Sequence, residues 1–411
     1  MDAAKRKTHG GTHDGTHDGT HSGEDINPLA NFPHPSYVKL LIIPDEELLN
    51  LVDTFIEAIF NEATYTKTLQ KMNIKKKCII TNLLEAQQQF YKSNMKENPM
   101  FLYNISDEEV KNIFNKTNGE KIDFHLFHEA RRIIQMVMDN FKTYENYERD
   151  LFDGKKLVTK KELENYIDRY LTENGITDNV KIEFKEDLIS AVKILKKKKQ
   201  YFLHLQSRKS VKEKMMLSLC NHEIGTHLLR MINHDRNNLD MYNFRSCSAT
   251  EEGLAVINSM YPFRRNHLFL VFPAIKYLTV CLGNFYPFSK LFFFLNTFVK
   301  DVDTCFKMCA RVKRGLKDTA TPGSVYHDQL YFIGSYSILK WHKSINFQLL
   351  YSGNIGLRCL NSVSNYVDVK DNMLPFFLSD EEKVSTYLKF LSEVSYLNGI
   401  TPASCSFIDN G

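Results

Sequence analysis

The segment NHEIGTHLLR carries the side chains best suited to metal-assisted chemistry. His222 and His227 are five residues apart, and Glu223 directly follows the first histidine. The common zinc peptidase motif, HExxH, has its histidines four apart, on one face of a helix. Five residues turn an ideal helix by ~140°, so both imidazoles reach one ion only if the helix is distorted. A π-bulge takes up one extra residue, and Gly225 makes such a distortion inexpensive.

These residues predict a zinc-dependent peptidase. Zinc binds neutral imidazoles and keeps a coordination position open for water. Glu223 would face that water and accept its proton. A third ligand is expected from SATEEGLAV, where Thr250 can cap a helix and Glu251 and Glu252 follow in its first turn. Gly253 would let this helix pack close to the metal helix.

Two other groups of histidines are weaker metal candidates. In HLFHEA, His125 and His128 could share a helix face beside Glu129, but no strand precedes them, and ordinary helix surface is the favoured interpretation. Four more histidines stand in the low-complexity N-terminal tail, where a solvated tail is favoured over weak metal binding: His9, His13, His17 and His21.

The patterns around these residues indicate an α+β fold, rich in helix, with a small mostly antiparallel sheet before the zinc-binding helix. Thr159 and Glu162 form a capping-box pattern, and Gly175 ends that helix. The strand over 200–206 could pair with an extended peptide. Lysines 196–199 at a hairpin tip are typical of a solvated turn, the alternative being contact with an acidic surface. The expected helices are 45–60, 79–92, 127–141, 160–174 and 211–232, and the expected strands are 180–184, 191–195 and 200–206.

Composition and length narrow the class of protein. The 411 residues divide into a low-complexity tail over 1–35 and an expected catalytic domain over 36–411. A net charge of +4 is too small to indicate nucleic acid. The apolar stretch 268–286 contains Lys276, which favours a buried core helix over a membrane span. Eight cysteines without a CxxC pair, and no apolar leader, favour the cytosol.

Several segments in the same order resemble one known family. HEIGTH followed by TEEGLA is similar to the HExxxH metallopeptidases of the microtubule-associated tyrosine carboxypeptidase family. NPMFLY at 98–103, YENYE at 144–148, GKKLVTKKEL at 154–163 and RVKRGLKDTATPGSVYHDQLYF at 311–332 also fit. The resemblance covers roughly residues 90–355.

The resemblance implies one Zn2+ per chain, bound by His222, His227 and Glu252, with Glu223 as catalytic base. It also implies removal of the C-terminal tyrosine from α-tubulin. The expected partner is then the α-tubulin C-terminal tail or the microtubule, in the cytoplasm, with no nucleic acid and no membrane. A peptidase of the same family with another substrate, and a microtubule-binding protein with an idle site, remain alternatives.

A carboxypeptidase must also bind a free terminal carboxylate, which calls for arginine or lysine, and must stabilise an oxyanion. Asp328 could orient a zinc-binding histidine. The candidates for both tasks lie in the segment 311–332: Arg311, Lys313 and Arg314 for the carboxylate, and Tyr326, His327 and Tyr331 for the oxyanion. The choice among the three oxyanion donors stays open.

Overall fold

The structure is a computed structural model that describes residues 49, 78–115, 122–152, 156–176, 179–186, 192–207, 210–242, 244 and 247–404. The low-complexity tail with its four histidines lies outside the described residues. So does the helix expected over 45–60, apart from Leu49. All elements named below belong to one unit of the chain, Pro35–Gly411.

The N-terminal helices largely follow the predicted pattern. The helix expected to begin at residue 79 begins at Leu83, because the chain before it is extended and Ile80 forms a bridge with Tyr103. Thr159 and Glu162 form the predicted capping box, and Gly175 has a φ of +65° just after the helix ends. The bounds are α2 (Leu83–Lys92), α3 (Asp107–Asn115), α4 (Phe127–Phe141), α5 (Tyr144–Leu151) and α6 (Lys160–Glu173).

The three predicted strands form one small sheet with the order β2-β4-β3. Strands β3 (Val192–Lys197) and β4 (Gln200–Gln206) are antiparallel, whereas β2 (Val180–Lys185) runs parallel to β4. Strands β1 (Leu157–Val158) and β5 (Val211–Lys212) form a separate antiparallel pair. The predicted α+β class, with a small sheet before the metal helix, is confirmed; the three-stranded sheet is mixed, with one parallel and one antiparallel pairing.

The prediction that the strand over 200–206 could pair with an extended peptide is wrong. Strand β4 is the central strand, so neighbouring strands already use the backbone groups on both of its edges. Its side chains Leu203 and Leu205 are buried, as expected for a central strand.

The segment expected as one helix over 211–232 is divided into several elements. Its first two residues extend as β5, where Val211 pairs with Val158. The rest forms the 3-10 turn η3 (Glu213–Met215), α7 (Met216–His222), the π-helix η4 (Glu223–Leu228) and α8 (Leu229–Arg236).

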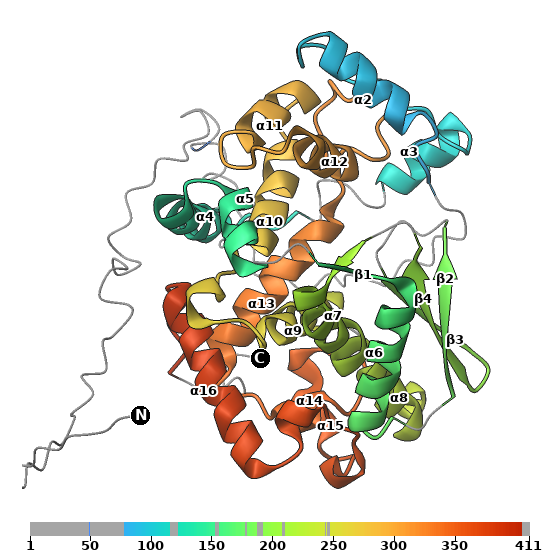
Figure 1. The fold of residues 1–411 in the computed structure, drawn as a ribbon, viewed down its shortest axis with the longest axis vertical. Coiled ribbons are helices and arrows are strands. Elements are labelled where there is room, and N and C mark those ends of the chain that lie inside the picture. The colour runs from blue at the N-terminus through green and yellow to red at the C-terminus, as the bar shows by residue number, and fades with distance from the viewer. Residues whose placement is uncertain are drawn as a thin grey trace, which may run out of the picture. The chain divides into compact units, whose positions relative to one another are not determined.

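The C-terminal half is almost entirely helical, as expected (Figure 1). In the described part of the chain, Arg265–Gly283 is the one helical stretch apolar and long enough to cross a membrane, and 83% of its window is buried inside the protein. The predicted buried core helix is therefore confirmed. The bounds are α9 (Ser248–Met260), α10 (Val271–Gly283), α11 (Phe288–Leu295), α12 (Val302–Val312), η7 (Tyr326–Gln329), α13 (Leu330–Trp341), α14 (Phe347–Leu350), α15 (Leu360–Val363) and α16 (Glu381–Leu397).

Helix α9 departs from the sequence prediction in two details. It begins at Ser248, so Thr250 lies inside its first turn and accepts a hydrogen bond from the Leu357 amide instead of capping the helix. A Cβ atom added to Gly253 would lie 2.2 Å from the backbone of Gly334. Gly253 therefore allows α9 to touch α13 backbone to backbone, and does not serve the approach to the metal helix.

Candidate metal centre

The helix that carries both histidines widens between them. Residues Glu223–Leu228 form a π-helix, in which each amide bonds to the carbonyl five residues earlier. The wider turn brings His222 and His227 to the same side, with their ring centroids 5.1 Å apart. The predicted distortion between the two histidines is confirmed, and Gly225 lies within it.

Buried polar side chains from other elements hold the widened turn. The Tyr351 hydroxyl donates to the Gly225 carbonyl at 2.6 Å. The Asn258 amide donates to Tyr351 at 2.9 Å and to the Thr226 hydroxyl at 2.8 Å. Thr226 in turn donates to the carbonyl of Asn221, five residues earlier, at 2.8 Å. Because all of these groups are buried, losing one partner would leave another polar group unsatisfied.

Gly225→Ala is expected to weaken both the fold and metal binding. A Cβ atom at this position would lie 2.6 Å from the Tyr170 hydroxyl, well inside van der Waals contact. Overpacking of this kind typically costs about 1–3 kcal/mol. Urea unfolding and competition for zinc with a chromogenic chelator would measure the two effects.

The contact with Tyr170 can be tested by a double-mutant cycle. Adding Tyr170→Phe to Gly225→Ala removes the clashing oxygen, so the double variant should lose less than the sum of the two single variants. Strict additivity would show that the steric explanation is wrong.

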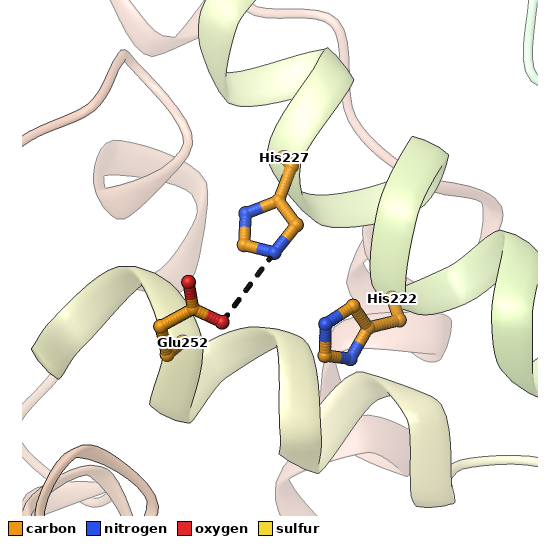
Figure 2. Close-up of side chains that lie close together, drawn as sticks. All are labelled: His222, His227 and Glu252. Carbon is orange, nitrogen blue, oxygen red and sulfur yellow. Dashed lines mark ion pairs between the residues drawn. The ribbon is translucent and has the colours of Figure 1, made fainter. Parts of the chain in front are cut away.

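His222, His227 and Glu252 form one potential metal group. One ligand atom from each lies within 4.8 Å of the others. Figure 2 shows both imidazoles directed from the π-containing helix towards the carboxylate on α9, and Nε2 of His227 is 3.9 Å from Oε2 of Glu252. Two imidazole nitrogens and one carboxylate oxygen are the ligands of many catalytic zinc sites, so the donor set fits a zinc ion.

Each histidine is oriented through a second interaction. His222 makes a hydrogen bond to the backbone of Ala255. Nδ1 of His227 is 2.7 Å from Oε1 of Glu251, and the other oxygen of Glu251 pairs with the buried guanidinium of Arg230. Such partners fix the ring orientation and tautomer of a metal ligand. Because Glu251 is engaged in this way, Glu252 completes the metal group.

The electrostatics of the group favour a cation. Burial lowers the pKa of His222 well below its usual value, and neighbouring His227 lowers it further, so His222 is a neutral donor. Burial also acts to lower the pKa of His227, but the hydrogen bond with Glu251 and the charges of Glu251, Glu252 and Glu223 raise it to about 9. Three carboxylates beside two imidazoles leave a site where positive charge is stabilised.

Comparison with known proteins identifies the family. The model of the family "Microtubule-associated tyrosine carboxypeptidase" matches residues 67–395, most of the chain. The chain belongs to this family. The resemblance seen in the sequence is thereby confirmed.

The chain is similar to named mammalian proteins over most of its length. The microtubule-associated tyrosine carboxypeptidase 1 of Rattus norvegicus is 29% identical over 326 residues, covering 77% of this chain and 68% of the relative. The protein of the same name from Homo sapiens is 28% identical, covering 77% and 67%. The putative tyrosine carboxypeptidase MATCAP2 of Mus musculus is 28% identical over 341 residues, covering 80% and 63%.

Two of the predicted substrate residues of this family member interact electrostatically with Glu252. Arg311 pairs with Asp328 at 2.8 Å, and against the effect of burial this partner, with smaller contributions from Tyr331 and Glu252, raises the pKa of Arg311. Burial, followed by the charge of Glu252, raises the pKa of Tyr331, so its phenol stays protonated. The prediction that Asp328 orients a zinc-binding histidine is wrong, because Asp328 holds Arg311 and Glu251 supports the histidine.

The other predicted substrate residues are not brought to the metal group in the same way. Lys313 is fully buried, and its ammonium donates to the carbonyls of Gly283 at 2.8 Å and Thr321 at 3.0 Å. The Lys313 ammonium, which was predicted to bind the substrate carboxylate, is thus buried and already hydrogen-bonded within the protein. The charge of Arg314 acts instead on Cys78 and Tyr103.

Tyr326 and His327 differ in exposure. Tyr326 is buried, whereas His327 is exposed, with its ring centroid 6.4 Å from that of Tyr331. Of the three predicted oxyanion donors, Tyr331 is the one whose pKa is raised by burial and then by the charge of Glu252.

The sequence analysis missed a second cation near the group. Nζ of Lys276, on α10, lies 4.0 Å from the ring centroid of Tyr331. Its charge adds to the effects of burial and of His227 that lower the pKa of His222, and, against burial, to the larger effect of Arg311 that lowers the pKa of Asp328. The signal was present in the sequence, because Lys276 interrupts an otherwise apolar helix. It was used there only as evidence against a membrane span.

The rival cluster does not form a metal group among the described residues. His125 pairs with Asp123, and Glu129 pairs with Arg132 at 2.7 Å on the same helix. The interpretation as ordinary helix surface agrees with the partner of Glu129, but His125 lies in the turn before α4, so His125 and His128 do not share a helix face.

Proposed function

We propose that this protein is a zinc-dependent carboxypeptidase that removes a C-terminal tyrosine from an acidic peptide tail, with the α-tubulin tail as its substrate. The observation that carries the proposal is the convergence of His222, His227 and Glu252 beside Glu223. The names of its relatives, tyrosine carboxypeptidases described as microtubule-associated, support the reaction and the partner. The catalytic domain would be residues 36–411, in a cytoplasmic and microtubule-linked protein.

Glu223 is suited to move the protons of the reaction. A zinc ion held by the three ligands would act as a Lewis acid and make water acidic enough to attack at neutral pH. Glu223 follows His222 directly, and its charge reaches His227 and Tyr331, so it lies at the same site. It would accept a proton from the attacking water and deliver it to the leaving amine.

Three further side chains are suited to the substrate. The protonated phenol of Tyr331 can donate a hydrogen bond to the oxyanion that develops on the attacked carbonyl. Arg311 and Lys276 supply positive charge from α12 and α10, where the free carboxylate of a C-terminal residue needs it. An endopeptidase would not need two cations here.

The two alternatives make different demands. A peptidase of the same family with another substrate would keep this site and change the surfaces that meet the peptide. The presence of the ligand set, the base and the cations together argues against an idle site in a microtubule-binding protein.

The protein is expected to bind about one zinc per chain and to release tyrosine from a tubulin-tail peptide. Elemental analysis and mass spectrometry of the peptide would measure both, and a chelator should abolish the activity reversibly. His227→Ala should lose one equivalent of zinc, which separates the site from loose binding by tail histidines. Full zinc content in His227→Ala would contradict the assignment of the site.

Recognition of the free carboxylate has its own test. Arg311→Ala and Lys276→Met are each expected to lower kcat/KM about 10- to 100-fold, with zinc content unchanged. This fold-change corresponds to the free energy of one hydrogen bond to a charged group. Arg314→Ala is the matched control, because its charge acts elsewhere. A peptide with an amidated C-terminus should be a poor substrate. If amidated and free peptides are cut equally, the enzyme is an endopeptidase.

A further inference from the structure

The three-stranded sheet has two chemically different faces. Tyr201, Leu203 and Leu205 of β4 are buried on one face. The strand register places Phe202 and His204 on the opposite face, next to residues of both flanking strands. This outer face is formed by the side chains that alternate with the buried ones.

Lysines dominate this outer face, which we name the lysine face: Lys181 and Lys185 of β2, Lys193 and Lys197 of β3, with Glu183, Leu195, Phe202 and His204 between them. Lys181, Lys193 and Lys197 are exposed and form no ion pair with any described residue. Lys185 pairs with Glu183 at 2.7 Å. Of the described strand residues on this face, four are lysines and one is a glutamate.

The lysine charges converge on the centre of the face. His204 is 9% exposed and lies 3.3 Å from Glu183. Burial lowers the pKa of His204, and the charges of Lys185, Lys197 and Lys193 lower it further against the effect of Glu183. Four lysines against one glutamate leave the strand residues of this face with a net positive charge.

The opposite face attaches the sheet to the metal-binding part of the fold. Strand β3 contacts the π-helix η4, which carries His227. Lys196 and Tyr201 both reach Asp235 on α8, directly after that helix. A partner bound on the lysine face would thus be held by a sheet that is anchored to the metal helix.

We propose that the lysine face binds a carboxylate-rich polypeptide and concentrates it near the metal group. The assignment of that polypeptide to the substrate rests on the proposed function, whereas the binding itself does not. Carboxylates suit this face better than nucleic acid. None of its described strand residues is an arginine for bidentate phosphate binding, and Lys197 covers the Phe202 ring at 5.3 Å, which removes it as a stacking platform.

A charge-reversal experiment tests the proposal on the full-length protein. The triple variant Lys181→Glu, Lys193→Glu, Lys197→Glu is compared with a control variant in which three exposed lysines elsewhere are reversed: Lys340→Glu, Lys343→Glu, Lys389→Glu. Fluorescence anisotropy with an amidated, glutamate-rich peptide measures binding without cleavage. The sheet variant should bind about 10- to 100-fold more weakly at low salt and show a smaller salt dependence, whereas the control variant should bind like the wild type.

Further measurements separate this proposal from the peptidase proposal. Cleavage of a short neutral peptide ending in tyrosine should be unchanged in the sheet variant, because that peptide does not reach the lysine face. If no peptide is cleaved by any variant but binding still depends on the sheet lysines, the peptidase proposal fails and the docking proposal stands.

Three results would overturn the docking proposal. The first is equal binding by the sheet variant and the wild type, and the second is an equal loss in the control variant. The third is tight binding of single-stranded RNA or of phosphatidylserine vesicles that the acidic peptide does not displace, which would assign the face to a different partner. If the glutamate variant does not fold, the corresponding lysine-to-glutamine triple variant gives the same comparison with half the change in charge.

Discussion

Glu223→Gln is expected to keep its zinc and to lose at least ~10²–10⁴-fold of its turnover. Glu223 belongs to the π-helix that begins directly after His222, but it is not a member of the potential metal group. Glutamine preserves its shape and removes its ability to accept a proton. Single-turnover kinetics on a tail peptide, with elemental analysis of the same sample, would measure both quantities.

The matched control for Glu223→Gln is Glu252→Gln. Glu252 supplies the carboxylate of the metal group, so this change should lower zinc affinity, and activity should return in part at high zinc concentration. If Glu223→Gln loses the metal while Glu252→Gln keeps both metal and turnover, the roles of the two carboxylates are reversed.

Glu251→Ala is expected to destabilise the fold by about 3–5 kcal/mol, the typical effect of removing one member of a buried ion pair. Arg230 has no exposed surface, and its guanidinium depends on Glu251 for the compensating charge. The carbonyls of Leu350 and Ile355 also accept hydrogen bonds from Arg230, but they carry no full charge. Urea unfolding of the zinc-free protein would measure the loss.

The same change should also lower zinc affinity about 10- to 100-fold, because Glu251 orients the His227 ring through Nδ1. Glu252→Ala, one residue away, is the control: it should lose the metal but leave the stability of the zinc-free protein nearly unchanged. Equal stability of the two alanine variants without zinc would contradict a structural role for Glu251.

The sequence by itself determined the features that depend on neighbours along the chain. The spacing of His222 and His227 predicted a distorted helix, because the angle per residue of an α-helix cannot bring both rings to one ion. The capping box at Thr159 and the three short strands are likewise local, and these predictions are confirmed. The order of the motifs was sufficient to predict the family.

Other local predictions failed where a distant segment competed. Val211 has a sequence consistent with the start of a helix, yet pairing with Val158 draws it into a strand. Thr250 was expected to cap α9, but the helix begins two residues earlier and Thr250 bonds to Leu357, more than a hundred residues away. Local propensity is weak compared with such contacts.

Only the tertiary structure decided which chemically equivalent residues do which task. Glu251 and Glu252 are neighbours of the same residue type, and in the sequence only the family resemblance favoured Glu252. Their adjacent positions on α9 turn Glu251 towards Arg230 and Glu252 towards His222 and His227. Lys313 and Lys276 were both visible as cations, yet the first is satisfied by buried carbonyls and the second lies beside Tyr331. The physical reason is that burial and charge partners come from helices far apart in the sequence, and these set where a side chain's charge can act.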